Sequence, residues 1–274
     1  MGVVEATYAE IKQQELKKNP YSCLLTAAID VNPHQVEAFT FSLAAMKLGG
    51  AVLADEVGLG KTIEADLVLK YLLNSGSQKI LLVMPSNLRK QWQVELDEKF
   101  EVESLIVESG NWDEYKSYVK NESAVVIVSY NFASRRKSEF AKVPWSFCVF
   151  DEAHRLRNVY KNGSKMASNL YELTKGIPKL MLTATPMQNS LFDLYGLIQF
   201  IDKRIFYSKA VFSDRYIKNE QYEDLRHQVS TVLQRTLRKE VSDYIQFPER
   251  KEMTVDFELS LPEVELYMKI NNYQ

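Results

Sequence analysis

The hydrophobic positions of the chain fall into short runs separated by polar stretches. Each run is bounded by polar residues, glycine or proline, as expected of a strand that is buried on both faces. We therefore predict strands at residues 51–54, 80–84, 104–107, 124–128, 147–150 and 180–182.

A different spacing fills the stretches between these runs. Residues 35–48, 61–74 and 88–100 carry apolar side chains three or four positions apart, which predicts amphipathic helices. Strands that alternate with helices indicate βαβ units. The predicted fold class is therefore α/β, with a mostly parallel sheet flanked by helices.

The pattern changes after about residue 200. A helical spacing predicts a small helical appendage over 203–250, and it is carried by Leu225, Val229, Val232, Leu233 and Leu237. Residues 251–259 alternate like an exposed strand, so 251–274 is predicted as a returning strand and the start of a linker. Residues 1–30 are predicted as an N-terminal helical lead-in, and 31–202 as the main lobe.

The composition is that of an ordinary globular protein, with 46% apolar and 26% charged residues among 274. No apolar run approaches the roughly 18 residues needed to cross a bilayer, and the N-terminus is too polar for a secretory signal. The two cysteines, Cys23 and Cys148, cannot form a disulfide framework, which indicates a reducing, cytoplasmic setting. The net charge of −2 shows no basic excess of the kind typical of nucleic-acid binders.

The first predicted strand is followed by DEVGLGKT at 55–62 and then by a helix. A strand, a glycine loop and a helix N-terminus form an anion cradle, because backbone N–H groups and the helix dipole favour negative charge. Gly58 and Gly60 permit close approach of phosphates, Lys61 would reach the β- and γ-phosphates, and the Thr62 hydroxyl would bind Mg²⁺. Asp55 departs from the general pattern, which has glycine there. The alternative is a surface loop that contains this tripeptide by chance.

The fifth predicted strand ends in Asp151 and Glu152. Carboxylates at the end of a parallel strand lie in the crevice where such sheets bind ligands. Asp151 would hold Mg²⁺ and Glu152 would polarise an attacking water, whereas the alternative is a solvated acidic turn. His154 alone is more typical of a structural hydrogen bond than of a catalyst.

The sixth predicted strand ends in hydroxyl side chains, Thr183 and Thr185, followed by Pro186. Alone, this is an ordinary transition from strand to turn. Its position after the other two motifs favours a functional role for these hydroxyls.

Three segments, DEVGLGKT, DEAHRLRN and TATPMQNSLFDLYGLIQFI, closely resemble the helicase-like motifs of superfamily-two ATPases. The form of the phosphate loop is similar to that of the Swi/Snf-type double-stranded-DNA translocases and chromatin remodellers, especially their bacterial, RapA-like branch. The resemblance extends over roughly residues 30 to 270. Asp66 departs from the small residue that is common there in the bacterial branch.

The resemblance implies ATP and Mg²⁺ as cofactors. Gln35 matches the adenine-reading glutamine of the family, while Lys61, Asp151 and Glu152 match its catalytic residues. The metal ligands would be Thr62 and Asp151. The implied nucleotide-binding set is Gln35, Glu56, Gly58, Leu59, Gly60, Lys61 and Thr62.

The resemblance also implies DNA contacts and a relay between the nucleotide and the DNA. The relay would consist of His154, Thr183, Thr185 and Gln188. The DNA-facing residues would be Ser86, Lys90, Ser129, Tyr130 and Arg155. For Trp92, core packing is favoured over a DNA contact. Two basic stripes are further candidates for DNA contacts, and for each the alternative is a solvated charged face. The stripes are Arg135 to Lys137, and the set Arg155, Arg157, Lys161 and Lys165.

Motors of this family have two RecA-like lobes, and the second supplies an arginine that stabilises charge on the transferred phosphoryl group. No second set of motifs is present here, and Arg235 and Arg238 are poor substitutes because they lie in the predicted appendage. We therefore expect an isolated first lobe, nearly inactive alone, with weak affinity for double-stranded DNA.

The expected function is ATP-driven tracking along duplex DNA, in association with the nucleoid. The expected partners are the second lobe and, in some settings, RNA polymerase. No membrane partner is expected. The alternatives are a restriction-type or strand-separating helicase motor and a catalytically silent nucleotide-binding docking module.

Overall fold

The computed structural model describes residues 29–122, 124–161, 163–245 and 260–271. Met1–Val241 forms one compact unit and Ser242–Gln274 a second. The predicted strand at 251–259 lies outside the described residues, as does nearly all of the predicted lead-in at 1–30.

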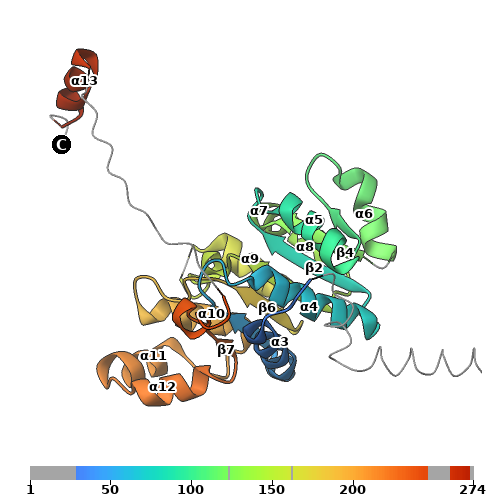
Figure 1. Ribbon diagram of the computed structural model, residues 1–274, viewed down its shortest axis with the longest axis horizontal. Coiled ribbons are helices and arrows are strands. Elements are labelled where there is room, and N and C mark those ends of the chain that lie inside the picture. Colours follow the sequence, from blue (N-terminus) through green and yellow to red (C-terminus); the bar gives the residue numbers. More distant parts are fainter. Residues whose placement is uncertain (1–28, 123, 162, 246–259, 272–274) are drawn as a thin grey trace, which may run out of the picture. The chain divides into compact units, whose positions relative to one another are not determined.

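The larger unit is built on one sheet of seven parallel strands in the order β3-β4-β2-β5-β6-β1-β7. Figure 1 shows this unit with its helices packed around the sheet. The strands are β1 (Gly50–Leu53), β2 (Lys79–Met84), β3 (Ser104–Ile106), β4 (Ala124–Ser129), β5 (Phe147–Asp151), β6 (Lys179–Leu182) and β7 (Leu233–Gln234). The first six lie within a residue of the predicted runs at nearly every end, so those predictions and the α/β fold class are confirmed.

The seventh strand corrects part of the predicted helical appendage over 203–250, because Leu233 lies in a strand and not in a helix. Leu233 pairs with Val52 and Gln234 with Leu53, so the chain returns to the sheet edge beside β1. A strand of two residues is too short to show a period of its own, and only its pairing with β1 defines it.

The three predicted helices are confirmed as α3 (Pro33–Ala45), α4 (Lys61–Asn74) and α5 (Arg89–Phe100). The other helices of this unit are α6 (Trp112–Asn121), α7 (Tyr130–Arg135), α8 (Lys137–Phe140), α9 (Lys165–Leu173), α10 (Leu191–Ile201), α11 (Lys209–Phe212) and α12 (Tyr222–Val229). The 3₁₀ helices are η1 (Met46–Leu48), η2 (Ala153–Leu156) and η4 (Arg238–Glu240), and η3 (Ser213–Lys218) is a π-helix.

The two faces of the sheet pack against different helices. Leu53, Leu82 and Leu182 belong to one core cluster, which includes Phe39 of α3 and Trp92 of α5. Their neighbours along the strands belong to a second cluster with the later helices; they include Val52, Val83 and Met181. Alternate residues therefore face opposite layers, so both faces of the sheet are covered.

The helices after residue 203 share an aromatic core with α10. Phe206 and Phe212 are buried and lie against Tyr195 of α10. The buried ring of Tyr216 packs in turn on Phe206 and Phe212. A boundary at residue 202 remains a prediction.

The smaller unit contains α13 (Leu261–Asn271).

Candidate functional site

The carboxyl ends of β1, β6 and β5 meet at one edge of the sheet, because these strands are neighbours. The three predicted motifs follow these three strands. The sheet order therefore brings together residues that are up to about 130 positions apart in the chain.

The phosphate loop has the backbone that its glycines permit. Gly58 and Gly60 have φ of 85° and 90°, in the left-handed region, and Gly60 is the N-cap of α4. A Cβ on Gly60 would lie 2.4 Å from Gln35 Nε2. The loop is therefore a cradle that a larger side chain would fill.

The Lys61 ammonium folds back onto the loop. Its Nζ donates to the carbonyl oxygens of Asp55 and Glu56 at 2.7 and 3.1 Å. Burial lowers the pKa of Lys61 below its usual range, and four nearby carboxylates oppose that shift. They are Glu64, Asp55, Glu152 and Asp151. Lys61 thus lies within electrostatic reach of the acidic end of β5.

Two carboxyl groups lie buried beneath the loop. Asp55 Oδ1 accepts a hydrogen bond from the Thr236 N–H at 2.7 Å, whereas its Oδ2 and both oxygens of Glu64 accept no hydrogen bond from an N–H or hydroxyl group among the described residues. Burial, reinforced by the neighbouring Asp55, raises the pKa of Glu64 well above its usual range. A proton on Glu64 lets it donate to Asp55, which removes the repulsion between the two groups. Asp55, the departure from the general pattern, is thus an internal ligand of the loop.

The acidic end of β5 is held by hydrogen bonds from two directions. Asp151 Oδ2 accepts from Trp92 Nε1 at 2.9 Å, and Oδ1 accepts from the Glu152 N–H at 2.8 Å. Burial raises the pKa of Asp151, and these two hydrogen bonds oppose the shift. Trp92 is 2% exposed, so the prediction of core packing is confirmed, and its indole N–H also orients a predicted metal ligand.

Glu152 adopts a backbone conformation that is uncommon for its residue type, with φ of 53°. Its Oε2 lies 3.1 Å from His154 Nδ1. A side chain with a left-handed backbone at the end of a buried strand is directed away from the strand path, and such positions often occur at functional sites.

The residues after β6 link the acidic motif to the hydroxyl motif. The Arg157 guanidinium donates to Gln188 Oε1 at 2.7 Å, and Asp193 Oδ2 accepts from the N–H groups of Gln188 and Asn189. Thr183 is buried, and its hydroxyl oxygen accepts from the Thr185 N–H at 3.2 Å. Of the predicted relay residues, Thr183 and Thr185 contact each other, Gln188 is held by Arg157 and Asp193, and His154 lies against Glu152. The relay between them stays a prediction.

Gln35, the predicted adenine reader, packs against the phosphate loop. Its Nε2 donates to the Leu59 carbonyl at 3.2 Å, and its Oε1 accepts from the Asn32 N–H at 2.9 Å. The adjacent His34, which the sequence analysis did not single out, places Nε2 2.8 Å from the same Leu59 oxygen. The adenine contact stays a prediction.

The predicted DNA-facing residues separate into two groups. Tyr130 is only 3% exposed and its hydroxyl donates to the Asp151 carbonyl at 2.7 Å, which corrects the placement of its side chain at the surface. A fully apolar strand before it and an aromatic neighbour, Phe150, draw the ring into the core. Ser129 caps α7 by accepting from the Phe132 N–H.

The remaining predicted DNA-facing residues, Ser86, Lys90 and Arg155, are exposed. Their DNA contacts stay predictions.

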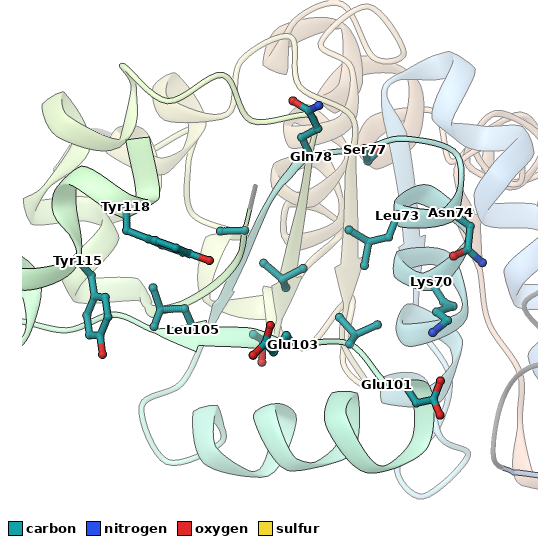
Figure 2. A pocket seen from close by; sticks show the side chains of 14 residues that line it. Lys70, Leu73, Asn74, Ser77, Gln78, Glu101, Glu103, Leu105, Tyr115 and Tyr118 are labelled. Carbon is teal, nitrogen blue, oxygen red and sulfur yellow. The ribbon is translucent and has the colours of Figure 1, made fainter. Parts of the chain in front are cut away.

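A separate cavity of about 430 Å³ lies at the opposite, amino ends of β2, β3 and β4 (Figure 2). Figure 2 shows side chains of α4, the β3 region and α6 around it, including Leu73, Leu105 and Tyr118. None of the predicted site residues lines it. The predicted chemistry therefore belongs to the carboxyl edge of the sheet.

The fold and the strand-end motifs define a RecA-like lobe of the helicase-like ATPase class. Residues 34–274 match the SNF2-related domain family. The chain belongs to this family, and its resemblance to the first lobe of Swi/Snf-type ATPases is confirmed.

Several relatives are similar over most of this chain. The "Uncharacterized ATP-dependent helicase YqhH" of Bacillus subtilis is 33% identical over 249 residues, covering 87% of this chain and 42% of that protein. The "RNA polymerase-associated protein RapA" of Serratia proteamaculans is 29% identical over 229 residues, covering 81% of this chain and 23% of that protein. The chain thus spans less than half the length of these relatives.

A solved structure shares the fold. The "Sulfolobus solfataricus SWI2/SNF2 ATPase core in complex with dsDNA" superposes with a TM-score of 0.65 at 23% identity, covering 77% of this chain and 45% of that one. At this identity the likeness establishes the fold alone.

Two further observations concern the described residues. No helix among them is long and apolar enough to span a bilayer. Cys148 is buried, and burial raises its pKa to about 12, so its thiol is unreactive at neutral pH.

Proposed function

We propose that this chain is the ATP-binding lobe of an ATP-dependent double-stranded-DNA translocase, which hydrolyses ATP with Mg²⁺ when joined to a second lobe. The observation that carries the proposal is the meeting of Lys61 with Asp151 and Glu152 at the carboxyl edge of the sheet. A cationic phosphate ligand and two carboxylates at one strand edge are the parts that phosphoryl transfer from a nucleotide requires.

The residues present suit a magnesium nucleotide. Mg²⁺ prefers hard oxygen ligands, which the Thr62 hydroxyl and the Asp151 carboxylate supply. The glycine loop, which a Cβ on Gly60 would fill, leaves backbone N–H groups at the start of α4 for phosphate oxygens. The bound metal would neutralise charge that develops on the phosphate oxygens.

The chain's own residues would then divide the work. Lys61 exchanges its two loop carbonyls for phosphate oxygens, which compensates its buried charge. Glu152 orients the attacking water, and His154, 3.1 Å from its carboxylate, responds to its position. The contact between Arg157 and Gln188 carries that change toward the residues after β6.

A groove supports the DNA part of the proposal. It has a volume of about 580 Å³ and is lined by Asn131, Ser134, Arg135, Lys165, Met166 and Asn169. Arg135 and Lys165 come from the two predicted basic stripes, and the Asn131 amide can donate to a phosphate without reading sequence. A basic patch confined to this groove needs no basic excess over the whole chain, so it is consistent with the net charge of −2.

The proposed partners follow from the relatives. One structural neighbour was solved with double-stranded DNA, and one relative is named as associated with RNA polymerase. We propose duplex DNA and a second RecA-like lobe as the partners of this chain, with a DNA-bound complex such as RNA polymerase as a further one, in a cytoplasmic, nucleoid-associated setting.

The direct test is the affinity of Lys61→Ala for a fluorescent ATP analogue. We expect the substitution to abolish detectable binding, because it removes the cation that faces the phosphates. Lys175→Ala, which removes an exposed lysine, is the matched control and should bind as the parent does. Retained affinity in Lys61→Ala would refute the phosphate-loop assignment. A strand-displacement assay on the full-length protein separates translocation from unwinding.

A further inference from the structure

A segment about 180 residues downstream lies along the phosphate loop. It comprises residues 234–238, and we call it the strap. The Ala54 and Glu56 N–H groups donate to the carbonyls of Gln234 and Thr236 at 2.8 and 3.1 Å, so the strap extends the pairing of β7 with β1 past the end of the sheet.

Side chains strengthen this contact in both directions. Asp55 Oδ1 accepts from the Thr236 N–H at 2.7 Å, and Glu56 Oε2 accepts from the Arg238 N–H at 2.8 Å. Glu56 was predicted to bind nucleotide, yet its carboxylate is engaged by the strap. The two acidic residues that begin the loop motif therefore act as internal ligands.

The Arg238 side chain completes the strap. Its Nε and Nη2 both donate to the Val57 carbonyl, at 3.2 and 2.8 Å. A Cβ on Gly58 would lie 3.3 Å from Nη2, so the guanidinium is close to the next residue of the loop as well. Arginine suits this position because its donors form a fixed planar fork, which a lysine ammonium does not provide.

The orientation of one peptide group follows from this bond. In a planar trans peptide the C=O and the following N–H point in opposite directions. When Arg238 holds the Val57 carbonyl toward itself, the Gly58 N–H must point away from the strap. The φ of 85° at Gly58 then lets the chain turn toward Lys61.

We propose that Arg238 is a positioning residue for nucleotide binding: by fixing the Val57–Gly58 peptide, it holds the phosphate loop in the shape that receives a nucleoside triphosphate. This inference rests on the proposed ATP binding. It gives Arg238 a role distinct from that of an arginine that touches the transferred phosphoryl group.

The test compares Arg238→Ala with the parent in the full-length protein. We expect the KM for ATP and the dissociation constant of a fluorescent ATP analogue to rise about tenfold, the effect of losing hydrogen bonds from a charged donor. The kcat should stay within about twofold, because an interaction made equally in the ground and transition states affects KM alone. Arg226→Ala, which removes an exposed arginine of α12 outside the strap, is the matched control and should behave as the parent does.

A second variant covers the case in which Arg238→Ala fails to fold. Arg238→Lys keeps the charge but loses the fork, so its KM should lie between those of the parent and Arg238→Ala. Parental KM in Arg238→Lys or in Arg238→Ala would overturn the proposal. A fall in kcat with unchanged KM would also overturn it, since that indicates a smaller folded fraction. If the parent itself binds no ATP analogue, the proposed function fails instead.

Discussion

Two buried carboxyl groups occupy positions where a sequence pattern has a smaller residue: Asp55, where the general phosphate-loop pattern has glycine, and Asp66, where the bacterial branch commonly has a small residue. Asp55 bonds to the strap and to a protonated Glu64, so its presence has a structural reason. Asp66 does not: it lies on α4, fully buried, and neither carboxyl oxygen has a partner among the described residues. Burial, with a smaller effect of Glu95, raises its pKa well above the usual range.

Asp66→Ala should stabilise the protein at neutral pH. A raised pKa means that the folded state binds the proton more tightly, so the stability of the parent falls as pH rises above about 3.8 toward the higher pKa of the folded state. Removal of an unpaired buried polar group should raise the free energy of unfolding by about 1–3 kcal/mol at pH 7. The gain should shrink as pH falls toward 4.

Urea unfolding at pH 7 and pH 4 measures this effect. Asp97→Ala, on the exposed face of α5, is the control and should change stability by less than about 0.5 kcal/mol. A gain that is the same at both pH values would show that Asp66 is not the titrating group.

Whole elements were more predictable than individual contacts. The six longer strands and the start of α4 at Lys61 follow from local patterns, since buried strands are continuous apolar runs and the glycine loop marks the helix start. Strand β7 and the strap depend on pairing with β1, about 180 residues earlier, and no local pattern encodes such a contact. Lys61 and Asp151 stand in local sequence motifs, so the sequence predicted them as site residues. His34 and Arg238 contact the phosphate loop from distant parts of the chain, so the sequence did not.

The position of α5 matters to the site through one hydrogen bond. Trp92 anchors this helix in the core and donates to Asp151, so the helix orients the predicted metal ligand. Trp92→Phe keeps an aromatic ring but loses the donor. We expect the Mg²⁺ concentration for half-maximal ATPase activity of the full-length protein to rise about tenfold. Loss of a hydrogen bond that orients a metal ligand typically weakens metal binding by at least this factor.

Trp145→Phe is a close control for this experiment. Trp145 is also buried, and its indole N–H donates to the Phe140 carbonyl, which belongs to α8 rather than to a site residue. It should lower stability by about 1 kcal/mol and leave the Mg²⁺ dependence unchanged. An equal shift in both variants would rule out a specific role for Trp92.

The described part of this chain presents one set of RecA-like motifs around one sheet. We predict that the 274-residue chain alone hydrolyses ATP negligibly, even with duplex DNA. In motors of this family the second lobe supplies the arginine that stabilises the transferred phosphoryl group, and such an arginine contributes about 10³–10⁵ in rate. Among the described residues, the guanidinium of Arg238 beside the loop is engaged with the Val57 carbonyl.

Phosphate release with and without DNA tests this prediction, with the full-length protein as the positive control. Robust DNA-stimulated turnover by the 274-residue chain would refute it.

The late arrival of β7 also bears on synthesis. Strand β1 is made early, yet both of its partners, β6 and β7, are translated more than 120 residues later. While the ribosome is still adding the middle of the chain, β1 has no neighbour to bond with, and its apolar residues are exposed to other nascent chains. The phosphate loop is completed only when Arg238 has left the exit tunnel. A ribosome-bound chain that ends before β7 should therefore contain the whole loop sequence and still lack the loop's folded shape.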